Sequence, residues 1–155
     1  MKAIVPYLWF SENNCEEAVN YYLSVFPNSE ILSKELYPPA HLDPHFEEMQ
    51  GKILNLEFML NGQKFAGIDG GPTFQFTEAI SFLIECEHQA EIDYYWSKLS
   101  HVEEAEACGW VKDRFGISWQ IVPENIADLM QTEAQVTALM GMKKIIIQEL
   151  IDAAT

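Results

Sequence analysis

Hydrophobic and polar positions in the first half of the chain follow the periods of strands and helices in a fixed order. Five elements are predicted: a strand at residues 3–10, a helix at 15–26, and strands at 29–37, 53–60 and 63–69. The dipeptide Asn61-Gly62 between the last two strands is typical of a two-residue β-hairpin. This half of the chain therefore predicts a βαβββ unit.

The second half repeats this order after a break at Gly70-Gly71-Pro72. Its predicted elements are a strand at residues 79–86, a helix at 88–99, a weak strand at 103–108, and strands at 110–112 and 117–122. Gly116, in the last turn, supplies a positive φ that a β-branched residue does not adopt easily. A pair of adjacent tyrosines occupies the same place in both predicted helices, which indicates an internal repeat.

These elements predict one α+β domain over residues 1–155, built from two modules and a helical tail. Its parts are a βαβββ module at residues 1–69, a linker at 70–78, a second βαβββ module at 79–123 and the tail at 124–155. Helices within the tail are predicted over residues 124–130, 132–140 and 143–154. Thr132 and Gln135 have the spacing of a capping box, which marks the start of the second of these helices.

Composition predicts a protein with a packed core and excludes polyanionic partners. Hydrophobic residues make up 48% of the 155 residues, so a sizeable core is available. The formal net charge is −15, and such a surface repels the phosphate backbone of nucleic acids and the anionic lipids of membranes. We therefore expect neither nucleic acid nor membrane as a partner.

The three cysteines, Cys15, Cys86 and Cys108, have no regular spacing, which argues against a disulfide framework and is typical of a reducing compartment. No histidine or other base is placed to activate Cys108, so a buried, inert thiol is favoured there. The N-terminus has the pattern of a first strand and lacks the features of a signal peptide. No apolar run reaches the ~20 residues of a membrane span. We expect a soluble, cytoplasmic protein.

Eight motifs, in order over nearly the whole chain, carry a resemblance to a known superfamily. They are PYLWF (6–10), EEAVNYY (16–22), VFPNS (25–29), NGQKF (61–65), GGPTFQFTEAISF (70–82), YYWSKLS (94–100), CGWVKDRFGISWQIVP (108–123) and GMKKI (141–145). The chain resembles the vicinal oxygen chelate superfamily of glyoxalase I, bleomycin-resistance proteins and extradiol dioxygenases, and within it the PhnB-like group. The resemblance implies two βαβββ modules that form a curved, mostly antiparallel, cup-like sheet.

Enzymes of this superfamily use a divalent metal, held by ligands on the first and last strand of each module. Aligned on the helices and the hairpin glycines, the four ligand positions fall near Val5, Ala66, Ala79 and Gln120. Three of these cannot bind a metal, and a shift by one residue adds only Ser81, a weak ligand. His41 and His45 supply no site, because Pro44 separates them within an expected loop at residues 38–51. No cofactor is expected, and a divalent metal requires a different alignment of the ligands.

PhnB-like proteins often carry the name of a demethylubiquinone methyltransferase, which implies S-adenosylmethionine as a cofactor. The common enzymes of that type bind it at a glycine-rich turn from a strand into a helix. Here the Gly70-Gly71-Pro72 segment is followed by residues that predict no helix, and Pro72 has no amide donor. We interpret this segment as the hinge between the modules.

Alternate strand residues line the concave face of such a sheet, and aromatic residues with a few polar groups form a reasonable small-molecule pocket. The predicted lining residues are Tyr7, Trp9, Phe58, Phe74, Phe76, Ser81, Trp110, Trp119 and Gln120. Gln120, between Trp119 and Ile121, is a candidate for the pocket floor, although a glutamine on a solvated sheet face is the commoner case. For any single aromatic residue, contacts in the core or at a dimer interface are the simpler interpretation.

Glu57, within the run LNLEFML, is the candidate for catalysis. A buried, unpaired carboxylate is costly, and burial raises its pKa towards the range that suits a general base. A position on the polar side of the strand is an equally good interpretation.

Three functions follow as hypotheses. The first is a metal-free homodimer that binds an unknown small molecule in an aromatic pocket. The second is an enzyme of the superfamily, either metal-dependent through other ligands or base-catalysed through Glu57. The third is a partner-binding protein whose cup is filled by its own side chains and whose apolar tail, residues 145–151, forms the interface.

Overall fold

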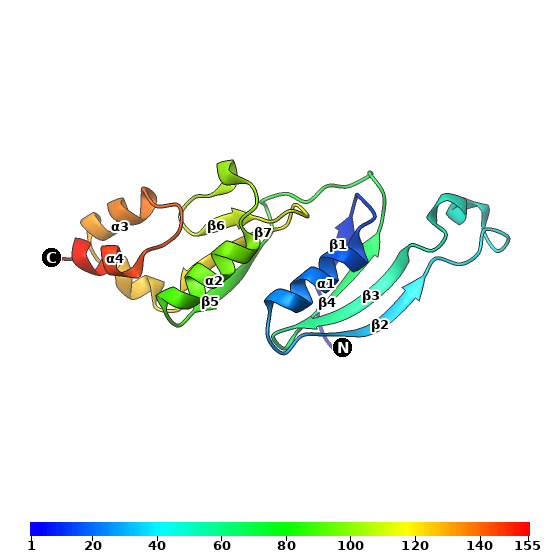
Figure 1. The fold of residues 1–155 in the computed structure, drawn as a ribbon, viewed down its shortest axis with the longest axis horizontal. Helices are drawn as coiled ribbons and strands as arrows, with labels where there is room; N and C mark the ends of the chain where they lie inside the picture. Colours follow the sequence, from blue (N-terminus) through cyan, green and yellow to red (C-terminus); the bar gives the residue numbers. More distant parts are fainter. The chain divides into compact units, whose positions relative to one another are not determined.

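The computed structural model describes residues 1–155 in two units, Met1–Phe76 (unit 1) and Thr77–Thr155 (unit 2). Each unit contains one β-sheet with an α-helix along one of its faces (Figure 1). This arrangement confirms the predicted α+β class. None of the helices combines the length and the apolar character that crossing a membrane requires.

Unit 1 contains the predicted βαβββ order. Its elements are β1 (Tyr7–Phe10), α1 (Cys15–Val25), β2 (Glu30–Leu36), the 3-10 helix η1 (Pro44–Met49), β3 (Ile53–Leu60) and β4 (Gln63–Asp69). The strand order is β1-β4-β3-β2, with β1 parallel to β4 and the other neighbours antiparallel. The first strand begins only after Pro6, which has no amide hydrogen to donate to a neighbouring strand.

A buried carboxylate joins the helix of unit 1 to its sheet. Asp69, at the end of β4, is 4% exposed, and its two carboxylate oxygens accept hydrogen bonds from the amides of Cys15 and Ile53 at 2.9 and 2.8 Å. Because Cys15 opens α1, the carboxylate lies at the positive end of the helix dipole and satisfies a helix-end amide. The helix buries Val19 and Tyr22 completely.

The segment after β4, residues 70–76, is held against the first strand of unit 1. The Trp9 ring lies over Gly70, where an added Cβ would come within 2.1 Å of the ring. The Trp9 indole nitrogen donates a hydrogen bond to the Gly71 carbonyl at 2.9 Å. Phe74 meets the Trp9 ring edge-on, with 4.9 Å between the ring centroids. This segment is therefore part of unit 1.

Unit 2 repeats the order of unit 1 with one strand fewer. Its elements are β5 (Ser81–Cys86), α2 (Gln89–Leu99), the 3-10 helix η2 (Glu103–Ala105), β6 (Trp110–Lys112) and β7 (Ser118–Pro123). The strand order is β5-β7-β6, with β5 parallel to β7 and β6 antiparallel to it. By order and direction, β5, β7 and β6 therefore correspond to β1, β4 and β3 of unit 1.

The predicted strand over residues 103–108 is wrong. This segment contains η2 and a tight turn in which Cys108 and Gly109 both have positive φ, 50° and 87°. Glutamate and alanine, which make up most of the segment, fit poorly into strands. The His101 amide, just before this segment, donates to the Lys112 carbonyl at 3.0 Å, and the Ala107 amide within it donates to the Trp110 carbonyl at 3.2 Å, so residues 101–107 cover the edge of β6. In unit 1 the corresponding edge is paired with β2.

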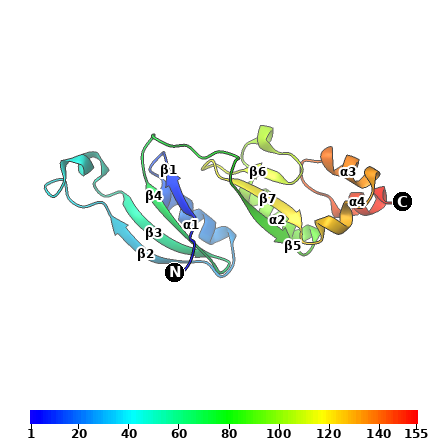
Figure 2. The same cartoon turned by 180° about the vertical axis from the view of Figure 1, so that it is seen from behind.

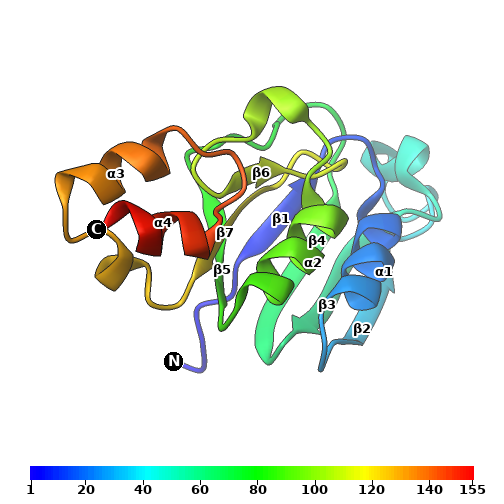
Figure 3. The same cartoon turned by 60° about the vertical axis from the view of Figure 1, so that its left-hand side comes forward.

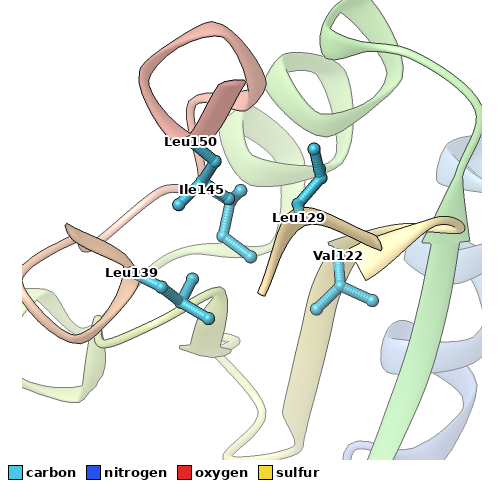
Figure 4. Close-up of a cluster of buried hydrophobic side chains, with 5 residues drawn as sticks. All are labelled: Val122, Leu129, Leu139, Ile145 and Leu150. Atoms are coloured by element: carbon cyan, nitrogen blue, oxygen red, sulfur yellow. The ribbon is translucent and has the colours of Figure 1, made fainter. Parts of the chain in front are cut away.

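The tail forms a helical layer beside β7 (Figure 3). It contains the 3-10 helix η3 (Ile126–Leu129), α3 (Glu133–Met140) and α4 (Ile147–Ala153), and α3 begins with the predicted capping box. Side chains of this layer and of β7 form one apolar cluster (Figure 4): Val122, Leu129, Leu139, Ile145 and Leu150. Ile145 and Leu150 are 1% and 0% exposed, so these parts of the predicted interface at residues 145–151 lie within the protein's own core.

The connection from α3 to α4, residues 141–146, is an irregular segment that we call the strap; the sequence predicted the first turn of a helix in its second half. The carbonyls of Met142 and Lys143 accept hydrogen bonds from the amides of Cys108 and Gly109, both at 2.8 Å. At Gly109 an added Cβ would lie 3.0 Å from Ile145 Cδ1, so glycine permits this close approach. Main-chain hydrogen bonds to the turn at Cys108 and Gly109 thus replace the bonds that the first turn of the predicted helix would make.

Candidate functional site

Each sheet has one face covered by its helix and an opposite face, which we call the far face. Side chains alternate between the two faces along a strand. In unit 2, Trp119 and Ile121 face α2 and are 4% and 0% exposed, while Gln120 between them points to the far face, which is turned to the viewer in Figure 2. The strand register places two rows on this face: the Gln120 row of Leu83, Gln120 and Trp110, and the Ser118 row of Ser81, Ser118 and Lys112.

A neutral hydrogen-bonded pair lies between the two rows. The Gln120 side-chain nitrogen Nε2 donates to Ser81 Oγ at 2.9 Å, across the parallel strands β7 and β5. Gln120 and Trp110 are half-buried, and Leu83 is 55% exposed. If the carboxamide rotates, its oxygen accepts from the Ser81 hydroxyl and its NH2 group becomes free to donate. The pair can thus offer a ligand either a donor or an acceptor, beside an indole ring.

The charges next to this pair neutralise each other. The Lys112 ammonium group forms an ion pair with the Glu78 carboxylate, and this hydrogen bond holds the pKa of Glu78 below its ordinary value. The Ser118 hydroxyl, on the strand between Ser81 and Lys112, is 2% exposed and has no hydrogen-bond partner. The two rows on the far face of unit 2 therefore combine neutral polar groups, a paired charge and apolar surface, and the exposed Glu85 lies one row further along β5.

The far face of unit 1 has polar groups that bind one another. The register places Tyr7 beside Ala66 and Ala66 beside Glu57. The Tyr7 hydroxyl donates to the Asn55 side-chain oxygen Oδ1 at 2.9 Å. Partial burial, together with nearby acidic groups, raises the pKa of Tyr7, so its phenol stays protonated. The central residue of this row is an alanine, which offers no polar group.

The general-base hypothesis for Glu57 depended on burial and a raised pKa, and the structure shows the opposite. The Glu57 side chain is 34% exposed and forms an ion pair with Lys64 at 3.1 Å. Ser33 Oγ also donates to its carboxylate, at 3.2 Å. The hydrogen bond from Lys64 is the main reason that the pKa of Glu57 is lowered. Glu57 is therefore a stable carboxylate on the polar side of the strand and a weak base.

The structure divides the predicted pocket residues into three sets. Phe58 and Trp119 lie on the helix-covered faces of their sheets, at 0% and 4% exposed, away from the far faces. Trp9 and Phe74 contact each other and the segment after β4, and Phe76 meets the ring of Phe10 edge-on. Tyr7 lies on the far face of unit 1, and so does Trp9, which alternates with the buried Leu8 and Phe10. Ser81, Trp110 and Gln120 lie on the far face of unit 2.

The residues at the superfamily's metal positions do not fit a divalent metal. The register places Tyr7 beside Ala66, and Leu83 beside Gln120, whereas the sequence alignment placed the ligand positions of these strands near Val5 and Ala79. A protonated phenol and a neutral amide are poor metal ligands. No group of three or more histidine, cysteine, aspartate or glutamate side chains in the structure is placed to hold a metal ion.

The segment with two glycines does not fit S-adenosylmethionine either. The Gly71 amide donates to the Asn13 side-chain oxygen Oδ1 at 2.9 Å, and the Gly71 carbonyl accepts from Trp9. The Trp9 ring fills the space over Gly70. The next element after this segment is the strand β5 and not a helix, so the segment lacks the strand-to-helix turn that holds such a cofactor.

Asp113, which is 2% exposed, was not among the predicted site residues. One carboxylate oxygen accepts from the amides of Phe115 and Ile117 at 2.8 and 3.0 Å, and the other accepts from the Trp119 indole at 2.9 Å. An aspartate at the first position of a turn is a known signal for this arrangement. Asp113 thus fixes the hairpin that presents Gln120.

A protein family described as 3-demethylubiquinone-9 3-methyltransferase has a sequence profile that matches residues 2–122. The chain belongs to this family. A PhnB protein from Bacillus cereus is 33% identical, with a TM-score of 0.65, and the similarity covers 78% of this chain and 99% of that protein. This confirms the PhnB-like membership and is consistent with the vicinal oxygen chelate superfamily.

Two more distant structures share the fold. A protein from Pseudomonas aeruginosa is 21% identical with a TM-score of 0.55, covering 79% of this chain and 98% of that protein. A gene product from Arabidopsis thaliana is 21% identical with a TM-score of 0.50, covering 78% of this chain and 98% of that protein. The curated proteins include no match. The family match ends at residue 122, so the tail lies outside it.

Proposed function

We propose that this chain is a metal-free binding protein for a small neutral molecule, which it holds on the far face of unit 2. The observation that carries the proposal is the Ser81–Gln120 hydrogen bond of 2.9 Å, beside the half-buried ring of Trp110. A small-molecule site needs apolar surface and a few well-placed polar groups, and this face offers both. The ligand that fits is a flat apolar body with one amide, hydroxyl or carbonyl group.

The charges of the chain support a neutral ligand. Lys112, the cation of this face, is paired with Glu78, so it does not attract an anion strongly. The net charge of −15 repels anions at longer range. No unpaired carboxylate of the two rows is available to bind a cation, because the rows contain none.

The far face of unit 1 is a poorer candidate for the ligand site than the far face of unit 2. At the centre of the corresponding row, Ala66 has no polar side chain and is 4% exposed. Glu57 beside it is bound to Lys64 and Ser33, and a ligand would have to compete with both partners. The far face of unit 2 has the central polar side chain that unit 1 lacks.

Calorimetric titration with benzamide, a neutral aromatic amide, tests this proposal. We expect saturable binding to the wild-type chain, and a Gln120→Ala variant that binds about fivefold more weakly, since one neutral hydrogen bond contributes about 1 kcal/mol. Gln148→Ala is the matched control, because Gln148 makes its hydrogen bond to Asp152 on the exposed surface of α4. Equal weakening in both variants, or no binding at all, contradicts the proposal.

Thermal unfolding with added zinc, nickel, manganese or iron tests the metal-free part. We expect no saturable rise in Tm, because neither sheet offers the carboxylate and imidazole ligands that these ions need. A saturable rise with one of these ions favours the metal-dependent enzyme instead.

A further inference from the structure

We infer that the tail forms one wall of the ligand site in unit 2 and limits the length of the ligand. This inference rests on the proposed function of the same site. The tail lies outside the residues that match the family, so the wall is an addition to the part that the family profile describes. The inference stands on the strand register, on one apolar cluster and on the contacts of the strap.

The register shows where the tail meets the sheet. Along β7, Ser118, Gln120 and Val122 alternate with residues that face α2, so all three point to the far face. Gln120 is half-buried, whereas Val122 is 9% exposed. The difference arises because Val122 lies in the cluster with tail residues, where the labelled side chains converge (Figure 4). The tail therefore covers β7 one row beyond Gln120, at Val122, while Glu85 beside it on β5 stays exposed.

The apolar cluster that contains Val122 takes side chains from every part of the tail. Leu129 belongs to η3, Leu139 to α3, Ile145 to the strap and Leu150 to α4. A ligand that lies on the Gln120 row and extends along β7 towards Val122 meets this layer. A longer ligand fits in that direction only if a side chain of the layer is removed.

The strap fixes the wall on the β6 side of the sheet, on the same side of the Gln120 row as Val122. The turn at Cys108 and Gly109 leads directly into Trp110, and its two amides bind the strap carbonyls at 2.8 Å. Cys108 Sγ also lies 3.8 Å from the Met140 carbonyl oxygen. The Gln89 side chain holds the far end of the strap through the Ile145 carbonyl and the Ile147 amide, at 3.0 and 2.9 Å. The strap is therefore fastened at both ends.

Two amides of different length test the inference, benzamide and biphenyl-4-carboxamide. We expect the wild-type chain to prefer benzamide. In Leu139→Ala, the ratio of the two Kd values should move at least tenfold in favour of the longer amide. Ile151→Ala is the matched control, because Ile151 is 46% exposed on α4 and lies outside the cluster; its ratio should equal that of the wild type. An equal ratio in all three chains overturns the inference.

A measurement on the wild type keeps the test valid if Leu139→Ala does not fold. In a methyl-labelled chain, benzamide should shift the methyl signals of Val122 and Leu139 and leave those of Ile151 in place. Shifts at Gln120 without shifts at Val122 and Leu139 overturn the wall alone. The absence of any benzamide-dependent shift in unit 2 overturns the proposed function and the wall together.

Discussion

Gly62 and Gly116 each close a hairpin with a positive φ, and the residue four positions later lies at the centre of a sheet. In unit 1 that residue is Ala66; in unit 2 it is Gln120. The strands around them have the same order and direction. One supersecondary unit thus occurs twice with two different far faces, which shows that the fold alone does not determine which face binds a ligand.

The two units also treat the edge of the sheet differently. The edge of β3 is paired with the seven-residue strand β2. The corresponding edge of β6 accepts hydrogen bonds from His101 and Ala107, on either side of η2, and the turn at Cys108 and Gly109 is bound to the strap. Because a bare strand edge favours unwanted pairing, both solutions protect it, but only the second brings the tail next to the far face.

The largest effect is expected where the tail meets unit 2. Leu150→Ala should lower the free energy of unfolding by about 2–5 kcal/mol, because a fully buried leucine leaves a cavity. The neighbouring change Ile151→Ala, at an exposed site, should cost less than about 1 kcal/mol. Denaturant unfolding measures both variants. Similar values for the two contradict the role of the tail as part of the core of unit 2.

The next effect concerns the turn that binds the strap. Gly109→Ala should destabilise the chain by about 2–4 kcal/mol, because φ is positive and the new Cβ would lie 2.8 Å from the Ile121 carbonyl oxygen. Gly71→Ala in unit 1 is the control, since its φ is also positive but its Cβ would meet no atom within 4 Å. We expect about 1 kcal/mol there. Equal losses show that the close approach is unimportant.

Each unit buries one thiol, and the burial should affect both the stability of the chain at alkaline pH and the reactivity of the thiols. Burial raises the pKa of Cys15 and of Cys86 to about 12, from an ordinary value of 9.0. Since the folded pKa is raised, the stabilisation is complete below pH 9 and is lost as the pH rises towards 12. At pH 8, Ellman's reagent should titrate only the half-exposed Cys108 in the native chain, and all three thiols after unfolding. Rapid reaction of three native thiols contradicts this burial.

A smaller and opposite effect is expected at Ser118. Its hydroxyl is buried without a partner, so Ser118→Ala should raise the free energy of unfolding by about 1 kcal/mol. Ser97→Ala is the control, because Ser97 Oγ donates to the Tyr94 carbonyl at 2.7 Å on the surface of α2. That change should not stabilise the chain. Destabilisation by Ser118→Ala indicates that the hydroxyl has a partner in solution.

The smallest effect is expected at Glu57 in unit 1. Glu57→Gln should change Tm by no more than about 2 °C at pH 7, because half-exposed ion pairs contribute little. The pKa of Glu57 is lowered from 4.5, so its contribution is present above that pH and is lost as the pH falls through the lowered value. The two chains should therefore converge in Tm in acid. A variant more stable than wild type at pH 7 contradicts the favourable ion pair.

Sequence patterns predicted most of the fold because period and turn chemistry agree over long stretches. The helices α1 and α2, the Asn61-Gly62 hairpin and the turn at Gly116 all lie close to their predicted places. The errors fall where distant contacts decide. The strap is not helical because its carbonyls meet the amides of a turn more than thirty residues earlier, and no local pattern in the sequence reveals this pairing.

The candidate site was harder to predict than the fold. Alternation along a strand shows which residues share a face, but not which face the helix covers, so Phe58 and Trp119 stood beside Tyr7 and Gln120 in the predicted pocket. The pairing of Gln120 with Ser81 depends on a parallel register between strands 39 residues apart. The state of Glu57 likewise depends on Lys64 and Ser33 across two strand pairs.

The contrast between the two far faces is tested most directly by mapping benzamide binding with side-chain NMR signals. We expect benzamide to shift the Gln120 amide and Trp110 indole signals saturably, and to leave the Asn55 amide signals on the far face of unit 1 in place. Both residues of unit 2 lie in one row of the sheet. Shifts at Asn55 with none at Gln120 and Trp110 place binding on the wrong unit and contradict the account.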